Sequence, residues 1–380
     1  MNTLAQARAE TDALFRLVRP GSLYERPIPE RHRIIFYLGH LEAFDWNLLS
    51  NALGLHPVDG GLDRLFAFGI DPPPGELPQD RPSDWPVVEE VERYCRRVRE
   101  AVDGVAIPEE LLHVAVEHRL MHAETFAYIL HQLPYAEKVG AGADEARIRL
   151  EEGGTGRSGS DWRMCDVPAG LARLGRSRSE GFGWDNEFDA CVVDVPAFAI
   201  GRHKVTNGDY LEFVRQGAAA PFFWTERNGG WCYRGMWSEV PLPLDWPVYV
   251  THDEATAYAR WRGMRLPTEA EWHRAACGSA VSRNVDFATW DPIGVDEGNP
   301  GIEQMIGNGW EWTSTVFAPF PGFAPMPFYE NYSAPFFDGQ HFVLKGASPR
   351  TAGRFLRASF RNWFRPSYPY LYATFRLVES

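Results

Sequence analysis

Apolar residues recur at helical spacing through the first third of the chain. Four stretches show this pattern, at residues 3–18, 30–53, 87–102 and 108–133. The second stretch contains RIIFYLGHLEAFDWNLLSNAL and is mostly apolar, which predicts that it lies inside a bundle because its sides cannot all be in water. Four helices of this length predict an up-down four-helix bundle.

The pattern changes after residue 161, where short apolar stretches such as ACVVDVPAFAIGRHKV and WPVYV alternate with glycine, proline and aromatic residues. Helical spacing returns at residues 206–217 and 252–263, and again at 268–277 after a short break. We therefore expect an α+β domain in which irregular loops cover a small sheet.

A polar, glycine-rich segment separates the two patterns at residues 139–160. This composition indicates a linker or a mobile loop near a domain boundary. A chain of 380 residues is also long for a single hydrophobic core. We expect a helical domain at residues 1–138, a linker at 139–160 and a second domain at 161–380.

Composition and charge narrow the class of protein. Hydrophobic residues make up 44% of the chain and charged residues 23%, as in soluble globular proteins. The formal net charge of −13 argues against a nucleic-acid-binding protein, which needs a basic surface. No run of 18 apolar residues predicts a membrane span, and charges interrupt the N-terminal segment where a signal peptide would be apolar. We expect a cytoplasmic protein, and the sequence leaves its oligomeric state open.

The cysteines do not form a recognisable pairing or zinc-binding pattern. They are odd in number and far apart, and no CxxC motif occurs. In a reducing compartment this predicts five free thiols. They are Cys95, Cys165, Cys191, Cys232 and Cys277.

The stretch HRLMH places two histidines, His118 and His122, four residues apart on a predicted helix. Residues at this spacing share one helix face, so the two imidazoles can converge on one metal ion. The internal glutamate of the HExxH zinc motif is missing, and chance alone also explains such a pair on a helix with four histidines.

His40 is the best candidate for a third ligand. It lies midway along the other strongly apolar helix, where an unpaired imidazole would cost on the order of 1–3 kcal/mol. Core burial with a backbone partner is the alternative explanation. Together with His118 and His122 it would form a three-histidine site between two helices, of the kind that suits Fe(II), zinc or copper.

Motifs in both halves of the chain resemble those of the ergothioneine/selenoneine synthase family, in the same order. The family joins a DinB-like iron-binding domain to a domain of the formylglycine-generating-enzyme type. The matching stretches are the early His40, HxxxHxE from His118, and VPAGLARLG, RSEGFGWDNE, HKVTNGDY, RLPTEAEWHRAA, GNGWEWTST and SFRNWFRP. The resemblance implies an α+β two-domain fold, with an N-terminal DinB-like four-helix bundle and a C-terminal formylglycine-generating-enzyme/C-type-lectin-like domain.

The resemblance implies a non-haem Fe(II) enzyme that uses O₂ to join a chalcogen to the imidazole carbon of a histidine derivative. In the ergothioneine branch hercynine (trimethylhistidine) reacts with cysteine or γ-glutamylcysteine, and in the selenoneine branch it reacts with a selenosugar. The ovothiol branch usually carries an added methyltransferase domain, for which 380 residues leave no room. No cysteine follows Cys277, so the copper-binding cysteine pair of true formylglycine-generating enzymes is missing.

The resemblance also assigns substrate-binding residues near the C-terminus. Asn362 and Trp363 match the family's RNW motif, which contacts the betaine end of hercynine; a core-packing role for Trp363 is the alternative. Phe364 and Tyr368 stand where mycobacterial-type relatives have an acidic residue and an arginine that hold γ-glutamylcysteine. An aromatic pair cannot make those charged contacts but suits the apolar face of a sugar ring, which favours a selenosugar donor. Other ergothioneine branches also lack the charged pair and use cysteine.

Three further assignments follow from the resemblance. Met121 stands where many relatives have a glutamine that hydrogen-bonds the substrate imidazole, and a thioether has no hydrogen to donate. Tyr329 and Tyr332 are the candidates for the family's catalytic tyrosine, with packing roles as the alternative. Some relatives have a structural calcium ion in the second domain, and the sequence leaves open whether this chain binds one.

The sequence therefore predicts an Fe(II)- and O₂-dependent enzyme that forms a carbon–selenium bond between hercynine and a selenosugar. An ergothioneine sulfoxide synthase that uses cysteine or γ-glutamylcysteine is the first alternative. A non-catalytic, lectin-like binding module is the alternative of another class, and the three histidines argue against it.

Overall fold

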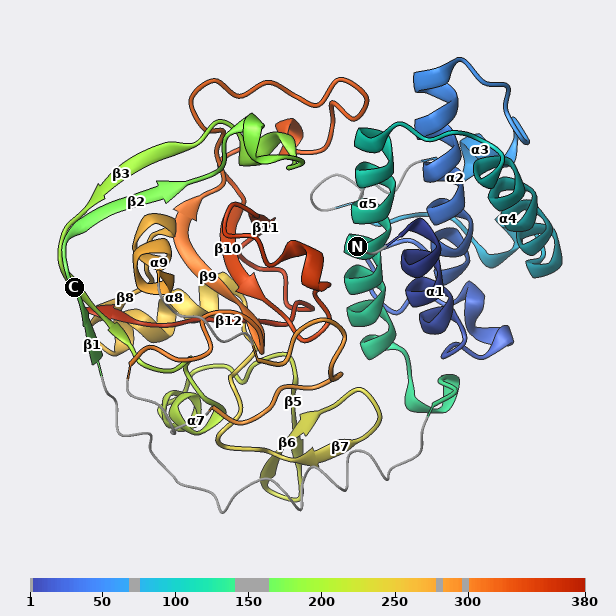
Figure 1. Ribbon diagram of the computed structural model, residues 1–380. Coiled ribbons are helices and arrows are strands. Elements are labelled where there is room, and N and C mark those ends of the chain that lie inside the picture. Colours follow the sequence, from blue (N-terminus) through green and yellow to red (C-terminus); the bar gives the residue numbers. More distant parts are fainter. Residues whose placement is uncertain (1–2, 68–75, 141–163, 278–282, 296–300, 380) are drawn as a thin grey trace. The chain divides into compact units, whose positions relative to one another are not determined.

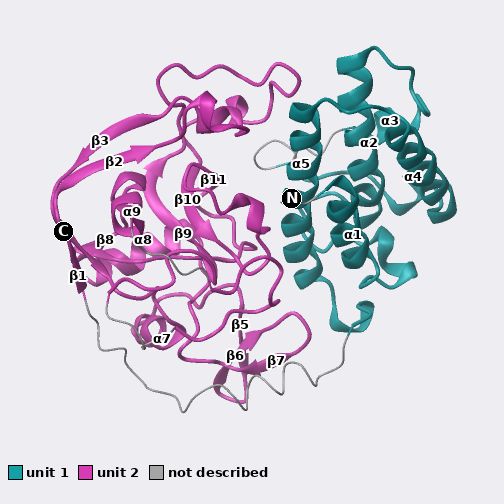
Figure 2. Ribbon diagram, viewed as in Figure 1, with its two compact units in different colours: residues 1–141 teal, residues 142–380 magenta. Residues whose placement is uncertain are grey.

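The structure is a computed structural model, and it describes residues 3–67, 76–140, 164–277, 283–295 and 301–379. It divides into two compact units, residues 1–141 and 142–380, which Figure 2 shows in different colours. Most of the segment expected to be a linker, residues 141–160, lies outside the described residues.

Unit 1 is helical (Figure 1). Helix α2 packs against α4 and α5, and α1 packs against α5. The four long helices expected from the sequence are confirmed, each within a few residues of its expected ends, and one short helix is added. The helices are α1 (Leu4–Phe15), α2 (Ile34–Leu53), the short α3 (Leu62–Leu65), α4 (Val88–Asp103) and α5 (Glu109–Gln132).

Helix α2 is buried along most of its length, as its apolar pattern predicts. Thirteen of its twenty residues are buried. Gly39 lets the ring of Phe66 pack against the helix, because a Cβ at this position would lie 2.6 Å from three of the ring carbons. The helix ends at Gly54, which has a left-handed φ of 68° that glycine adopts at little cost.

Among its described residues, unit 2 contains four small sheets where the sequence predicted one. A four-stranded sheet has the order β1 (Met164–Val167), β4 (Phe198–Gly201), β13 (Val378–Glu379) and β8 (Met264–Arg265). A second has the order β11 (Asn362–Phe364), β10 (Phe342–Ala347), β9 (Gly309–Val316) and β12 (Ala373–Thr374). The hairpin of β2 (Gly170–Leu174) and β3 (Cys191–Val195) and the meander of β5 (Trp224–Arg227), β6 (Gly230–Arg234) and β7 (Glu239–Pro241) complete the set.

The difference from the expected single sheet arises from strand length. Strands β8, β12 and β13 have two residues each, too few to show an alternating pattern. The apolar stretch 246–250 forms no strand, although Val248 and Val250 are buried. Their N–H groups donate to the carbonyls of Val205 and Ala373 at 2.9 and 2.8 Å, so single hydrogen bonds replace a ladder.

Three helices of unit 2 begin with the same local device. At each N-terminus a threonine side chain accepts from a backbone N–H three residues on, and the acidic residue there accepts from the threonine N–H. The sequence predicted these helices, and they are confirmed. They are α7 (Asn207–Arg215), α8 (His252–Trp261) and α9 (Glu269–Ala276), capped by Thr206, Thr251 and Thr268.

A buried carboxylate ties the strands and helices of unit 2 together. Glu311 lies in the middle of β9 and is fully buried. Its oxygens accept from Arg376 Nε and from Trp272 Nε1, each at 2.8 Å, and it also pairs with Lys204. A buried charge is tolerated only when it is paired in this way, so the network fixes which elements meet at the centre of the unit.

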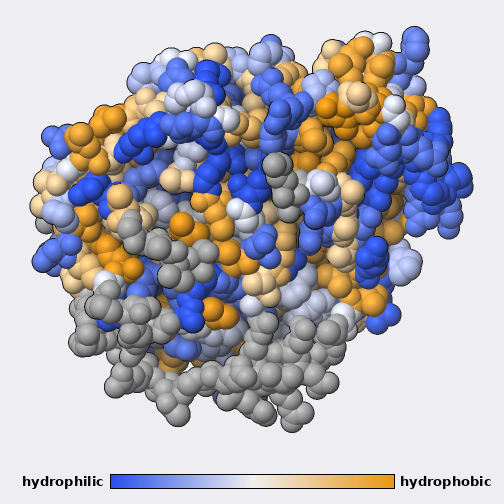
Figure 3. Space-filling model, in the orientation of Figure 1, coloured by the Kyte–Doolittle hydropathy of each residue, from blue (hydrophilic) through white to orange (hydrophobic). Residues whose placement is uncertain are grey.

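The surface drawn in Figure 3 mixes hydrophilic and hydrophobic residues. Among the described residues, no helix is both long and apolar enough to cross a membrane. The five cysteines are all free, as the sequence predicted.

We predict that Gly39→Ala destabilises unit 1 by about 1–3 kcal/mol, because the new methyl group would overpack against the Phe66 ring. Urea denaturation of the metal-free protein measures the change. Asn51→Ala, at an exposed position of the same helix, serves as the control and should change stability by no more than about 0.5 kcal/mol. Equal stability of the Gly39 variant and the unchanged protein would contradict the close approach of Phe66.

Candidate functional site

Three histidines of unit 1 come together between two helices. His40 lies on α2, and His118 and His122 lie one turn apart on α5. One ring nitrogen from each lies within 4.8 Å of the others. The ring centroids are 5.3 Å apart for His40 and His118, 4.9 Å for His40 and His122, and 4.5 Å for His118 and His122. The structure thus brings together the three residues that the sequence singled out as metal ligands.

The surroundings of the histidines orient their rings. The Nδ1 atom of His40 lies 2.7 Å from the carbonyl oxygen of Phe66, so this nitrogen carries the hydrogen and the lone pair is on Nε2. The ring of Phe44 stacks on that of His118 with centroids 3.3 Å apart. The Nε2 atom of His40 and the Nδ1 atom of His122 are buried without a hydrogen-bond partner among the described residues.

Burial keeps the three imidazoles neutral. It lowers the pKa of His40 to about 4, against the raising effect of the Phe66 carbonyl. Burial lowers the pKa of His118 and of His122 well below the usual value, and the neighbouring imidazoles and the positive charge of Arg119 lower them further. Neutral imidazoles have a free lone pair at neutral pH, which is the form that binds a metal.

The donor set fits a divalent transition metal. Three neutral nitrogen ligands suit Fe(II), zinc or copper and leave coordination positions open for small molecules. A metal ion would also satisfy the buried His40 Nε2 atom, which otherwise costs on the order of 1–3 kcal/mol. Met121 is half-buried on α5 directly before His122.

In unit 2, aromatic rings surround Trp363. This residue lies on β11, at the edge of its sheet. Its ring stacks on Phe317, with centroids 4.3 Å apart and planes at 5°. Tyr332 meets it edge-on at 5.3 Å, and Phe336 lies 5.6 Å away. The side-chain oxygen of Asn362 accepts from the Trp363 N–H at 2.9 Å, which holds the start of the strand.

The two candidate tyrosines lie next to each other, with ring centroids 5.6 Å apart. Tyr332 stacks on Trp184 at 3.9 Å, and Tyr329 lies edge-on to the same tryptophan at 6.3 Å. Burial, together with the negative charge of Asp185, raises the pKa of Tyr329 to about 12. Tyr329 therefore keeps its proton at neutral pH. Tyr332 contacts Trp363 through its ring, so it is the better placed of the two beside that residue.

Phe364 and Tyr368 form a second aromatic group. Their rings stack with centroids 5.4 Å apart. Tyr370 meets Tyr368 edge-on at 5.1 Å, and Phe222 meets Tyr370 edge-on at 5.0 Å. The group offers ring faces and phenol hydroxyls and no charged side chain of its own.

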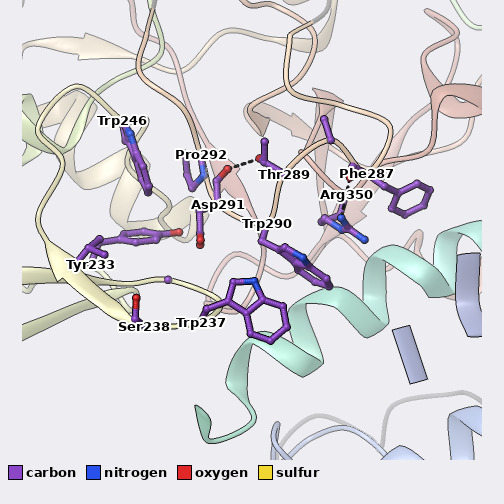
Figure 4. A pocket seen from close by; sticks show the side chains of 13 residues that line it. Tyr233, Trp237, Ser238, Trp246, Phe287, Thr289, Trp290, Asp291, Pro292 and Arg350 are labelled. Carbon is purple, nitrogen blue, oxygen red and sulfur yellow. Dashed lines mark hydrogen bonds between the residues drawn. The ribbon is translucent and has the colours of Figure 1, made fainter. Parts of the chain in front are cut away.

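A separate cavity of about 240 Å³ lies in unit 2 beside the β6–β7 hairpin. None of the predicted site residues lines it. Figure 4 shows the hydroxyl of Tyr233 pointing toward the carboxylate of Asp291. Trp237 and Trp290 lie on the side of Asp291 that is opposite Tyr233. The guanidinium of Arg350 lies 4.0 Å above the Trp290 ring, as a cation–π contact.

Comparison with known proteins identifies the family. Residues 157–299 and 280–380 match the model of the sulfatase-modifying factor enzyme 1-like domain. The hercynine oxygenase of Mycolicibacterium thermoresistibile is 35% identical over 337 residues, which cover 75% of this chain and 74% of that protein. The chain belongs to the hercynine oxygenase family. A second relative, the hercynine oxygenase of Mycolicibacterium smegmatis, is 34% identical, and the match covers 75% of this chain and 76% of that protein.

A longer relative matches nearly the whole chain. Ergothioneine biosynthesis protein 1 of Schizosaccharomyces pombe is 28% identical over 96% of this chain, which spans about half (54%) of that protein. The expected resemblance to the ergothioneine synthases and the formylglycine-generating-enzyme type of the second domain are confirmed. The DinB-like identity of the helical domain and the selenium donor stay predictions.

Sequence reasoning missed several residues that contact the predicted ones. Phe336 lines Trp363 together with Phe317, yet its loop has no periodicity from which to assign it. In unit 1, Arg119 pairs with Glu42 and Asp45 beside the histidines. The signal was present as two acidic residues in an apolar helix and an arginine next to His118, a pattern that predicts buried ion pairs.

We predict that the metal-free protein loses stability in mild acid. Folding lowers the pKa of His40 from 6.5 to about 4. The contribution of the neutral ring to the free energy of unfolding is therefore fully present above pH 6.5 and is lost as the pH falls toward 4. The loss is on the order of 2–3 kcal/mol. Urea denaturation between about pH 7.5 and 4.5 should show a flatter pH dependence for His40→Leu, and equal slopes would contradict the neutral, buried state of the ring.

We further predict that His118→Ala removes bound metal. After anaerobic loading with Fe(II) and desalting, elemental analysis should find iron in the unchanged protein and almost none in the variant. His113→Ala is the matched control, because His113 lies on the same helix and pairs with Glu109 at 3.8 Å. Retention of iron by the His118 variant at the level of the control would exclude the three-histidine site.

Proposed function

We propose that this chain is an Fe(II)- and O₂-dependent enzyme that forms a carbon–selenium bond between hercynine and a selenosugar. The observation that carries the proposal is a cluster of three neutral histidines, two buried and one half-buried, in a member of the hercynine oxygenase family. Iron held by His40, His118 and His122 would supply the redox chemistry with O₂. In this proposal residues 1–138 are a DinB-like metal-binding domain, and residues 161–380 bind the organic substrates.

The names of the relatives and the aromatic site support hercynine as the acceptor. The trimethylammonium group of hercynine is a permanent cation without an N–H to donate, so aromatic faces and oxygen atoms can hold it although it makes no conventional hydrogen bond. Trp363 with its neighbours Phe317 and Tyr332 offers such faces. We assign the betaine end of hercynine to Asn362 and Trp363.

Tyr332 and Tyr329 are the proposed proton donors. The pKa of about 12 for Tyr329 keeps its phenol protonated, which a donor requires. Tyr332 contacts both Tyr329 and Trp363 through its ring, which places it next to the proposed substrate-binding residue. Met121 beside His122 would pack against the substrate imidazole without hydrogen-bonding it.

The stack of Phe364 and Tyr368 supports a sugar-like donor. These residues replace the charged pair by which mycobacterial-type relatives are expected to hold γ-glutamylcysteine. Aromatic faces cover the apolar side of a sugar ring, while neither ring can neutralise a carboxylate or an ammonium group. The second candidate is an ergothioneine sulfoxide synthase that uses cysteine or γ-glutamylcysteine, and the relatives' names favour the ergothioneine branch.

Two other assignments carry less support. A non-catalytic, lectin-like module would leave the buried His40 Nε2 atom without a purpose and without a partner among the described residues. For the structural calcium, the described residues contain no second cluster of three or more histidine, cysteine or acidic ligands.

A donor competition tests the proposal. Anaerobic protein loaded with Fe(II) receives hercynine with equal amounts of selenosugar, thiosugar, cysteine and γ-glutamylcysteine, and air then starts the reaction. We expect the hercynine–selenosugar product to dominate in mass spectrometry. Dominance of a sulfoxide from cysteine or γ-glutamylcysteine would assign the chain to the ergothioneine branch, and no product from any donor would reject the enzyme.

A double variant sharpens the donor assignment. Phe364→Asp with Tyr368→Arg restores the charged pair, so the share of γ-glutamylcysteine product should rise at the expense of the selenosugar product. Tyr370→Phe keeps the aromatic group and is the control. An unchanged product ratio in the double variant would show that these two positions do not contact the donor.

A further inference from the structure

A network of buried charges lies directly beside the three histidines. Arg119, the residue after His118, is 1% exposed. Its guanidinium donates to Asp45 Oδ2 at 2.7 Å, to Glu42 Oε1 at 3.1 Å and to the carbonyl oxygen of Leu41 at 2.9 Å. All three acceptors belong to α2, so one side chain of α5 makes hydrogen bonds to three residues of the other ligand-bearing helix.

The network continues to the remaining long helices of unit 1. Arg99 of α4 donates to Glu42 Oε1 at 2.7 and 2.9 Å and to both oxygens of Asp12 on α1 at 2.7 and 2.8 Å. Arg119 also reaches the hydroxyl of Thr11 on α1 at 3.4 Å. Glu42 is therefore shared between two arginines, and its position is fixed from both sides.

The residues of this network are next to the candidate metal ligands in the sequence. Leu41 and Glu42 follow His40 on α2, and Arg119 follows His118 on α5. A rotation or slide of α5 against α2 that moved the histidine nitrogens apart would also break the fork of Arg119. Metal–ligand distances tolerate errors of only about 0.2 Å, so the spacing of these two helices must be set closely.

Stability alone is a weak reason for such a network. Buried ion pairs often contribute no more stability than well-packed apolar residues of the same volume, because the charges lose their hydration. Their better attested role is to select one arrangement among several. The positive charge of Arg119 would also repel a divalent cation, and Glu42 and Asp45 offset that repulsion.

We propose that Arg119 is a positioning residue for the metal centre: by gripping Glu42, Asp45 and the Leu41 carbonyl, it fixes α5 against α2 so that His118 and His122 face His40. The proposal rests on the metal site of the proposed function and is independent of which substrates react there. It predicts that the fork geometry of the guanidinium, and not only its charge, is needed.

Co(II) is a suitable probe, because its visible absorption reports ligand number and geometry. We expect Arg119→Met to lower the affinity of metal-free protein for Co(II) roughly 10–100-fold, the range for residues that orient metal ligands. The absorption spectrum of its Co(II) complex should also differ. Arg119→Lys keeps the charge without the fork, so it should keep the fold and give an intermediate loss of affinity.

Arg8→Met provides the matched control. Arg8 is also a buried arginine, and it pairs with Asp103 at 2.7 Å between α1 and α4, helices that carry no ligand. We expect this variant to lose thermal stability while its Co(II) spectrum and affinity stay within about twofold of the unchanged protein.

Two results would overturn the proposal. One is an Arg119→Lys or Arg119→Met protein that binds Co(II) with unchanged affinity and spectrum. The other is an equal loss of affinity in the Arg8 control, which would make the effect a general one of stability. If Arg119→Met does not fold, Arg119→Lys and Glu42→Gln decide the question by the same two readouts. Failure of the unchanged protein to bind Co(II) would instead reject the metal site itself.

Discussion

Three imidazoles that meet between two helices, two of them buried and one half-buried, impose the constraint on which unit 1 depends. Each ring has two nitrogens, and in the interior each nitrogen needs a partner. The Phe66 carbonyl takes one nitrogen of His40, which leaves the other for the centre of the cluster. The close packing of Phe66 on Gly39 and the stacking of Phe44 on His118 both follow from holding these rings in place.

The described part of unit 2 lacks long helices of this kind and is ordered by other interactions. Its strands are short and its sheets small, so buried ion pairs and aromatic rings carry much of its order. Glu311 fixes the centre, while Trp363 is held at a sheet edge among other rings. A metal can be held by a few residues on rigid helices, whereas a small organic molecule needs extended faces, which an aromatic-rich sheet edge offers.

The helices of unit 1 and the placement of His118 and His122 on one helix face could be predicted from the sequence because both are periodic features. His40 was informative because a polar ring in the middle of an apolar helix needs a partner. The two-residue strands could not be predicted, since they show no alternation, and their positions are set by long-range hydrogen bonds. The pairing of Arg119 with Glu42 and Asp45 was missed because it depends on how two helices are rotated against each other. Phe336 was missed because its loop follows no repeat.

Selectivity for the donor and the ligands of the metal are separate questions, and the ligands have to be established first. X-ray absorption of the Fe(II)-loaded protein, prepared without oxygen or substrate, tests the ligand assignment most directly. We expect three imidazole ligands about 2.0–2.2 Å from the iron, with the remaining positions filled by water oxygens. A shell of oxygen atoms without the outer scattering of imidazole rings would contradict it.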